Sequence, residues 1–333
     1  MQSKLSEFEL IQAFFEGLGP QSKDVCIGIG DDCAVINIPP DKSLCLSMDT
    51  MVEGVHFLPG APADKVAYRA LAAAMSDLAA MGAEPSHFTL SLTLPESNHQ
   101  WLTEFSQGLT LLAEQFHFPL VGGDTTKGPL TIALQVHGFT NKDQALTRSG
   151  AQDGDVVAVT GTLGDAGAAL AILSQLDAEK CSEAKSYLLE RYYAPTPRIK
   201  QGLELRALAN ACIDISDGLL ADAEHMAEKS ALEVEIDLDC LPLSDALLSE
   251  QGDKASAFAL SAGDDYELLF TMSEANWQQL NKQDETNIYT KIGRVKKGHG
   301  VVVKQGSMKS SSGKLSADLI ADLITTKGYK HFE

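Results

Sequence analysis

Apolar segments with the composition of β-strands recur in both halves of the chain, and several of them end in Gly and Asp. In the first half they read VCIGIGDDCAVINI, SLCLSMDTMVEG, LVGGDTTKG and LTIALQVHGF, and in the second half VVAVTG and YELLFTM. Runs of strong helix formers separate them, at about residues 62–81 and 96–116 in the first half. The pattern predicts mixed helix and sheet, with acidic residues at strand ends that a ligand can reach.

The 333 residues exceed the size at which one hydrophobic core stops growing, so two domains are expected. The segment ALTRSGAQDGD marks the boundary, which we place after residue 148. We therefore predict an α+β protein: residues 1–148 form a mixed sheet with helices on one face, and residues 149–333 form an α/β domain. Helices in the second half are expected near residues 184–193, 198–209 and 217–230.

The net charge is -20, from 26 basic and 46 acidic residues. Such a surface disfavours nucleic acid and anionic lipid, because both ligands require clustered Lys and Arg. A phosphate-bearing ligand would also be repelled unless a divalent cation lay between it and the protein.

The N-terminal residues lack a signal-peptide pattern, and no apolar stretch approaches the ~20 residues of a membrane helix, so we expect a cytoplasmic protein. Six cysteines without a C-x-x-C pair predict reduced, mostly buried thiols.

Six short segments carry the residues from which a site could be built. They are GIGDDC (28–33), SMDT (47–50), MSDLAAMG (75–82), GGDTT (122–126), DISDG (214–218) and AGDDYEL (262–268). Asp beside Gly is also the ordinary composition of a turn, so each segment alone has a structural interpretation.

Two of the segments suggest more than turns. Asp77 lies within an apolar helical run, where a carboxylate either faces water or is buried with a partner. Asp214 and Asp217 lie three residues apart at a strand-to-helix junction, where they could address one ion or serve as a helix cap and a turn.

Converging carboxylates would need a cation. Two unit charges ~4 Å apart repel by ~4 kcal/mol at an effective dielectric constant near 20. Mg²⁺, held by carboxylates and by substrate phosphates, is the usual remedy in phosphoryl-transfer sites.

Other nucleotide-binding signatures are absent. There is no G-x-x-x-x-G-K-[ST] sequence and no protein-kinase motif, and GTLGDAG (161–167) is typical of a tight strand-to-helix turn. His56 could contact a ligand or be structural. Arg148 could clamp a phosphate or form a surface ion pair.

Taken in order, the segments SEFELI, GIGDDCAV, DTMVEGVHF, SDLAAMGAEP, GGDTTKGPL, ALTRSGA, DISDGL, GDDYELLF and KGYKHF resemble the thiamine-monophosphate kinase family. This family belongs to an ATP-binding superfamily that includes aminoimidazole ribonucleotide synthetase and selenophosphate synthetase. The resemblance covers essentially the whole chain. It implies a homodimer built through the N-terminal sheets and transfer of the ATP γ-phosphoryl group to thiamine monophosphate, with several Mg²⁺ ions.

The resemblance also implies roles for individual residues. Gly123, Asp124, Arg148 and Ser216 would face the nucleotide, and His56, Asp264 and Tyr329 would lie near the substrate. The metal ligands would be Asp32, Ser47, Met48, Asp49, Asp77, Asp124, Asp214 and Asp217. Met48 stands where the family commonly has Thr, so its contact would use the backbone carbonyl. Asp264 stands where the family commonly has Glu, which is one methylene longer.

No catalytic general base is expected, because a phosphate monoester, with a second pKa near 6, is already largely anionic at neutral pH. Alternative functions are another synthetase of the same superfamily, of the selenophosphate or aminoimidazole ribonucleotide type, and a non-catalytic protein that binds Mg-nucleotide.

Overall fold

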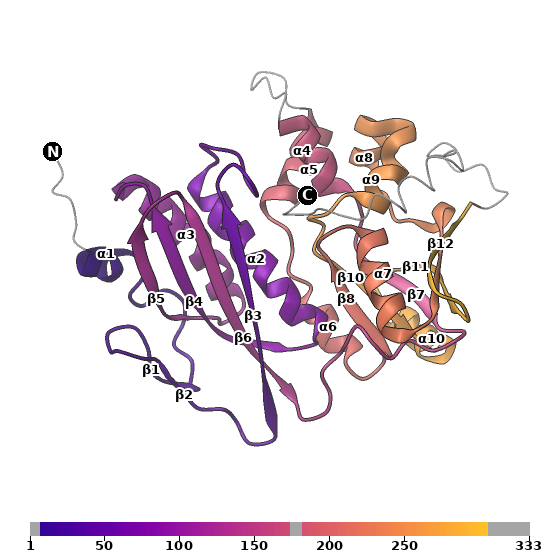
Figure 1. Ribbon diagram of the computed structural model, residues 1–333, viewed down its shortest axis with the longest axis horizontal. Helices are drawn as coiled ribbons and strands as arrows, with labels where there is room; N and C mark the ends of the chain where they lie inside the picture. The colour runs from indigo at the N-terminus through magenta and orange to yellow at the C-terminus, as the bar shows by residue number, and fades with distance from the viewer. Residues whose placement is uncertain (1–6, 174–181, 306–333) are drawn as a thin grey trace. The chain divides into compact units, whose positions relative to one another are not determined.

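The computed structural model describes residues 7–173 and 182–305. The chain divides into two compact units (Figure 1). Unit 1 comprises residues 1–78 and 83–145, and unit 2 comprises residues 79–82 and 146–333. The main division follows Ala145, close to the predicted boundary after residue 148.

Unit 1 is built on a four-stranded sheet with strand order β3-β6-β4-β5. The parallel pair β4–β5 and the antiparallel neighbours make it a mixed sheet, as predicted. Its strands are β3 (Lys42–Val52), β4 (Glu84–Leu94), β5 (Leu120–Lys127) and β6 (Thr131–Asn141). A short ribbon, β1 (Val25–Ile27) with β2 (Val35–Ile36), and helix α1 (Glu7–Phe14) complete the unit.

Helices α2 (Ala63–Ala80) and α3 (His99–Gln115) cover one face of this sheet (Figure 1). The interior of α2 is rich in Ala, and these small side chains let its neighbours approach closely. At Gly108 of α3, an added Cβ would lie 2.1 Å from the carbonyl oxygen of Asp64 in α2. The two helices therefore pack backbone against backbone, and helices on one face were predicted correctly.

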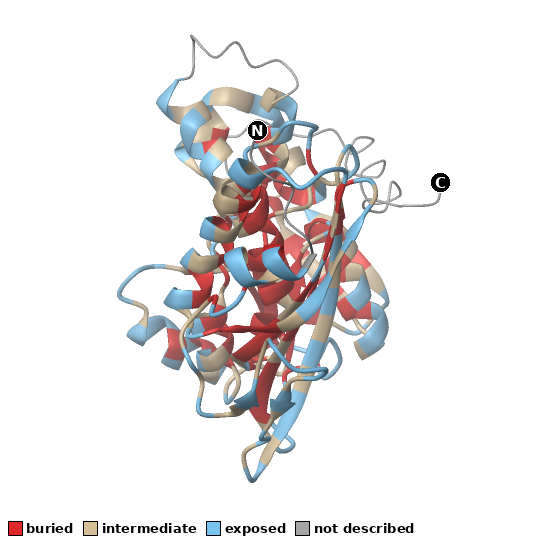
Figure 2. Ribbon diagram, turned by 90° about the vertical axis from the view of Figure 1, so that its left-hand side faces the viewer, coloured by how far each residue is buried: buried red, intermediate tan, exposed pale blue. Residues whose placement is uncertain are grey.

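The opposite face of the sheet is open. Along β3, alternate side chains point to opposite faces. On the open face Leu44, Leu46 and Met48 are 39%, 59% and 59% exposed. Figure 2 shows long strands of the chain with pale blue and tan stretches, the colours of exposed and intermediate residues.

Unit 2 contains a six-stranded sheet with the order β12-β9-β11-β7-β10-β8. Every pairing is antiparallel except β12–β9. The strands are β7 (Val156–Thr160), β8 (Ala211–Ile215), β9 (Glu233–Asp237), β10 (Glu267–Met272), β11 (Tyr289–Lys296) and β12 (Gly300–Lys304). Helix and sheet combine here as predicted, but the sheet is mainly antiparallel.

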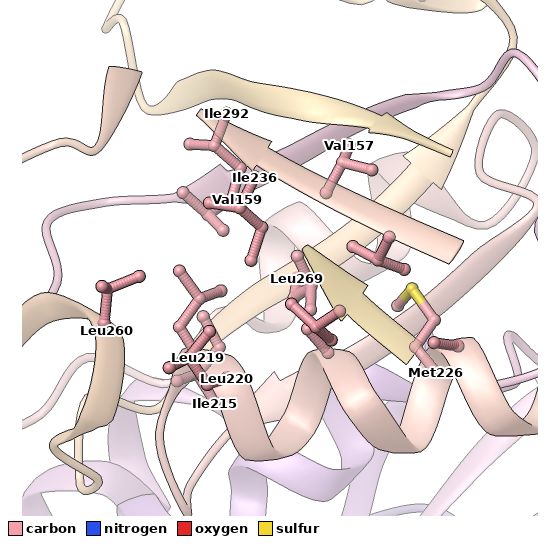
Figure 3. Close-up of a cluster of buried hydrophobic side chains, with 14 of the residues drawn as sticks. Val157, Val159, Ile215, Leu219, Leu220, Met226, Ile236, Leu260, Leu269 and Ile292 are labelled. Carbon is pink, nitrogen blue, oxygen red and sulfur yellow. The ribbon is translucent and has the colours of Figure 1, made fainter. Parts of the chain in front are cut away.

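The described helices of unit 2 are α4 (Asp165–Leu173), α5 (Glu183–Tyr193), α6 (Ile199–Leu205), α7 (Leu219–Ser230), α8 (Asp245–Gln251), α9 (Ala255–Ser261) and α10 (Glu274–Gln283), with 3₁₀ turns at Leu238–Cys240 and Gly252–Lys254. Of these, α5, α6 and α7 lie where the sequence predicted helices. In Figure 3, Leu219 and Met226 of α7 lie against sheet residues such as Leu269. This apolar contact fixes the position of the β8–α7 junction, where DISDG lies.

The prediction of mostly buried thiols is wrong for the described cysteines. Cys26, Cys33 and Cys240 are exposed, Cys45 is half-buried and Cys212 is buried, and none forms a disulfide. Cys26 and Cys33 lie in or beside the β1–β2 ribbon, and two strands are too few to bury a face.

Within the described ranges, no helix is long and apolar enough to cross a membrane.

Candidate functional site

The first group of candidate residues lies between β3 and α2. Ser47 and Asp49 occupy alternate positions of β3, on its helix-facing side, and Asp77 faces them from α2. The hydroxyl of Ser47 donates a short hydrogen bond to Oδ2 of Asp77. Burial, and then the charge of Asp77, raise the pKa of Asp49 to about 6. Asp77 is therefore half-buried with a partner rather than directed to open solvent.

Met48 lies between them in sequence but points the other way. Its side chain is on the open face of the sheet, 59% exposed. If it contributes to a site on the helix side, it must do so through its backbone.

The second group lines a cavity of about 670 Å³ in unit 1. Asp32, Gly123 and Asp124 form part of its wall, and Phe8, Ile11 and Phe15 supply apolar surface. An added Cβ at Gly123 would lie 1.9 Å from the carbonyl oxygen of Leu90, so only Gly fits there. This polar and apolar lining suits a ligand with both a flat ring and a charged group.

The sheet keeps the first two groups apart. Asp124 pairs with Ser91, Ser91 with Ala133, and Ala133 with Thr50. These four residues therefore lie side by side across the sheet, one on each strand. Three strand spacings, about 14 Å, separate the edges that carry Asp49 and Asp124. The two carboxylates cannot bind one ion within one copy of unit 1.

His56 occupies the turn after β3, and its ring is oriented by the backbone. Nδ1 accepts a hydrogen bond of 3.0 Å from the N–H of Val52. The His56 carbonyl accepts one of 2.7 Å from Arg69, which is buried in α2. Because Nδ1 is an acceptor, the neutral ring carries its proton on Nε2.

The third group lies in unit 2, where β8 and β10 pair. Leu268 is in register with Asp214, and the N–H of Asp264 donates to the Ser216 carbonyl at 2.9 Å. The structure thus brings DISDG and AGDDYEL side by side, with Asp264 bonded to Ser216 and Asp214 paired with Leu268 in the neighbouring strand.

Asp222 completes this group, and sequence reasoning missed it. Its carboxylate accepts hydrogen bonds of 3.1 Å from the N–H groups of Ser216 and Asp217. Burial, and then the charges of Asp214 and Asp217, raise the pKa of Asp222 to about 8. Gly218 is the N-cap residue of α7. Asp222 has no Gly neighbour, so the pattern of Gly–Asp segments does not indicate it.

Arg148 is exposed in unit 2. The adjacent Thr147 carbonyl accepts a hydrogen bond of 2.9 Å from Cys212 of β8. Arg148 thus lies beside the strand that carries Asp214. Tyr329 lies outside the described residues.

In the described part of the chain, no group of three or more His, Cys, Asp or Glu side chains could hold a metal ion by itself. The donors at Asp49 and Asp77 are all oxygen, and the repulsion between the two carboxylates is the kind that a bound cation relieves. These features fit Mg²⁺, which binds through one or two carboxylates and completes its shell with phosphate oxygens and water.

Known family models match both halves of the chain. Residues 30–140 match the family model "AIR synthase related protein, N-terminal domain", and residues 152–305 match the corresponding C-terminal domain. The chain is thus a two-domain AIR synthase related protein. A thiamine-monophosphate kinase of Escherichia coli (strain K12) is 49% identical over 272 residues, which are 81% of this chain and 83% of that protein. The chain belongs to the thiamine-monophosphate kinase family.

Solved structures agree with this assignment. The crystal structure of thiamine-monophosphate kinase from Stenotrophomonas maltophilia K279a superposes with a TM-score of 0.81 at 42% identity, over 85% of this chain and 92% of that one. A structure of AaThiL complexed with AMPPCP and TMP superposes with a TM-score of 0.74 at 35% identity, over 92% of this chain and 96% of that one.

Proposed function

We propose that this chain phosphorylates thiamine monophosphate to thiamine diphosphate, using ATP and Mg²⁺, by direct in-line transfer of the γ-phosphoryl group. The observation that carries the proposal is the likeness to AaThiL, a protein complexed with an ATP analogue and TMP, over 92% of this chain. We also propose that the reaction takes place in the cytoplasm.

The residues divide into three roles. Gly123, Asp124, Arg148 and Ser216 bind the nucleotide, and His56, Asp264 and Tyr329 bind the substrate. The metal ligands are Asp32, Ser47, Asp49, Asp77, Asp124, Asp214 and Asp217, with the backbone carbonyl of Met48. When bound, Mg²⁺ neutralises the charge that develops between the two phosphate groups.

The protein needs no general base for this reaction. The attacking phosphate oxygen is already largely anionic at neutral pH, because the second pKa of a phosphate monoester is near 6. His56, with its proton on Nε2, donates a hydrogen bond to that phosphate and orients it. Catalysis then consists of alignment and charge neutralisation.

We propose further that the active unit is a homodimer joined through the open sheet face. Leu44, Leu46 and Met48 supply an exposed apolar surface on this face. A two-fold contact there would cover this apolar surface on both copies. A Leu46→Asp variant is expected to be monomeric by light scattering and to lose activity. An active monomer would disprove the dimer requirement.

The central experiment is an assay with ATP and thiamine monophosphate, with and without EDTA, in which thiamine diphosphate is separated by chromatography. Product that disappears with EDTA supports substrate, reaction and metal together. Nucleotide binding without product would reject this substrate and point to the reactions of other AIR synthase related enzymes.

Asp49→Asn tests the metal role at one position. Loss of the carboxylate is expected to lower kcat by about 100-fold or more, as removal of an electrostatic stabiliser does. Full kcat at saturating Mg²⁺ would show that Asp49 does not bridge protein and metal.

A further inference from the structure

The segment between α9 and β10 has an unusual backbone. Asp264 has a φ of 68° and Tyr266 a φ of 51°, both in the left-handed region. Residues with a Cβ rarely adopt this conformation, because it brings the Cβ close to the following carbonyl oxygen. Two such residues in a span of three persist only where the surrounding structure holds them.

Backbone hydrogen bonds to β8 and its end hold one side of the segment. The N–H of Asp264 donates to Ser216 at 2.9 Å, and the N–H of Tyr266 donates to Ile215 at 2.8 Å. At Gly263, an added Cβ would lie 2.3 Å from the Ser216 carbonyl oxygen. The segment is therefore fixed directly on the DISDG turn.

The intervening residues anchor the other side. Asp265 and Glu267 are 2% and 1% exposed. Asp265 accepts a hydrogen bond of 2.7 Å from the N–H of Gly164. Glu267 accepts bonds of 2.5 and 2.6 Å from two nitrogens of Arg198. The side chains of Asp265 and Glu267 are thus bonded within the interior of unit 2, and those of Asp264 and Tyr266 are bonded to each other.

That pair is joined by its side chains. The hydroxyl of Tyr266 donates to Oδ1 of Asp264 at 3.0 Å. Tyr266 is only 8% exposed, so its packed ring fixes where the hydroxyl lies. The backbone of Asp264 is consequently held by the bond from its N–H to the Ser216 carbonyl, and its carboxylate by the bond from the Tyr266 hydroxyl.

We propose that Tyr266 is a positioning residue for the substrate, acting through Asp264. The inference rests on the proposed function, since it takes Asp264 as a substrate contact. A carboxylate accepts hydrogen bonds and repels phosphate, so Asp264 addresses the cationic ring or the amino group of thiamine monophosphate. Tyr266 sets the orientation in which the carboxylate receives that group. The side chain of Asp264 is short, so its orientation decides whether it reaches the substrate.

Tyr266→Phe removes the hydroxyl and keeps the ring. Because Asp264 is proposed to bind the ring or the amino group rather than the transferring phosphoryl group, it contributes equally to ground-state and transition-state binding. Losing its correct orientation should therefore raise KM and leave kcat unchanged. We expect KM for thiamine monophosphate to rise about tenfold, the loss typical of a hydrogen bond to a charged group. The KM for ATP and kcat should stay within about twofold.

Tyr289→Phe is the matched control. Tyr289 is also buried in unit 2, 6% exposed, and its hydroxyl donates to Glu204 at 2.6 Å. Its loss removes an equivalent hydrogen bond elsewhere and should leave all three kinetic constants unchanged. Thermal unfolding of both variants gives the structural cost of each substitution.

A double-mutant cycle with Asp264→Asn identifies the path of the effect. If Tyr266 acts through Asp264, the double variant has the KM of Asp264→Asn alone. An unchanged KM in Tyr266→Phe overturns the inference, and so does the same tenfold rise in the Asp264→Asn background. An Asp264→Asn enzyme with normal KM overturns the inference while leaving the proposed reaction intact. A wild-type protein that makes no thiamine diphosphate overturns both.

Discussion

Glu267 should be one of the most sensitive positions in unit 2 for folding stability. It is 1% exposed and accepts hydrogen bonds from two arginines, Arg198 at 2.5 and 2.6 Å and Arg191 at 2.8 Å. The Thr160 hydroxyl donates another at 2.6 Å. Glu267→Gln removes the negative charge and leaves two buried guanidinium groups facing a neutral amide. Breaking a buried ion pair in this way costs about 3–5 kcal/mol of unfolding free energy.

The same site gives a pH dependence with a defined sign. Burial alone raises the pKa of Glu267, but the hydrogen bonds and charges of Arg198, with the charge of Arg191, outweigh burial and lower it below 4.5. A folded-state pKa below the unfolded value means that the contribution is complete above about pH 4.5. It is lost as pH falls through the folded-state pKa. The Gln variant should lack this part of the acid sensitivity.

Urea denaturation of wild type, Glu267→Gln and Glu274→Gln tests the argument. Glu274 also contacts two cations, Lys291 at 3.3 Å and Arg294 at 2.8 Å, but its side chain is 45% exposed. An exposed ion pair contributes little to stability, because water and salt screen the attraction. The reasoning is refuted if Glu267→Gln costs no more than Glu274→Gln.

Three further predictions concern unit 1. The Gly123→Ala variant should lose nucleotide binding as measured by calorimetry, because its Cβ would lie 1.9 Å from the Leu90 carbonyl oxygen. A normal nucleotide affinity would show that this position does not require Gly. In steady-state kinetics, the His56→Gln variant should retain more activity than His56→Asn, because the Gln side chain can place an N–H near the position of Nε2. Equal activities of the two variants would exclude a role for the Nε2–H as donor. Burial and then the charge of His137 lower the pKa of His87 from 6.5 to about 4, so its contribution to stability is complete above pH 6.5 and falls toward pH 4. Relative to His87→Asn, wild type should lose about 1 kcal/mol of unfolding free energy between pH 7.5 and 5.5 in urea titrations, and parallel pH profiles would contradict this.

Much of the fold was predictable because its signals are local. The Ala-rich run around Asp77 predicted α2, and the apolar run through SMDT predicted β3. Strand β4 (Glu84–Leu94) was not singled out, although it lies inside the sheet, because it does not end in Gly and Asp. β9 and β12 pair in parallel across more than sixty residues, and no local pattern specifies such a partner.

The site was predicted by residue type but not by arrangement. Helical spacing placed Asp77 on α2, but the approach of Asp49 required the packing of α2 on β3. Strand order is a non-local property, so the sequence could not reveal that Asp49 and Asp124 lie at opposite edges. The partnership of Asp222 with the DISDG turn likewise depends on a helix that folds back on that turn.

The buried charges around Glu267 have a rationale in geometry rather than in stability. A buried ion pair usually stabilises a fold no better than apolar side chains of equal volume, because desolvation offsets the attraction. Apolar side chains at 265 and 267, however, would not fix the backbone direction that the hydrogen bonds from Gly164 and Arg198 impose. That direction keeps Asp264 and Tyr266 in left-handed conformations, at a cost of order 1–3 kcal/mol each. Because the network holds this strained segment against the DISDG turn, the residues of the third group keep their mutual geometry before any ligand binds.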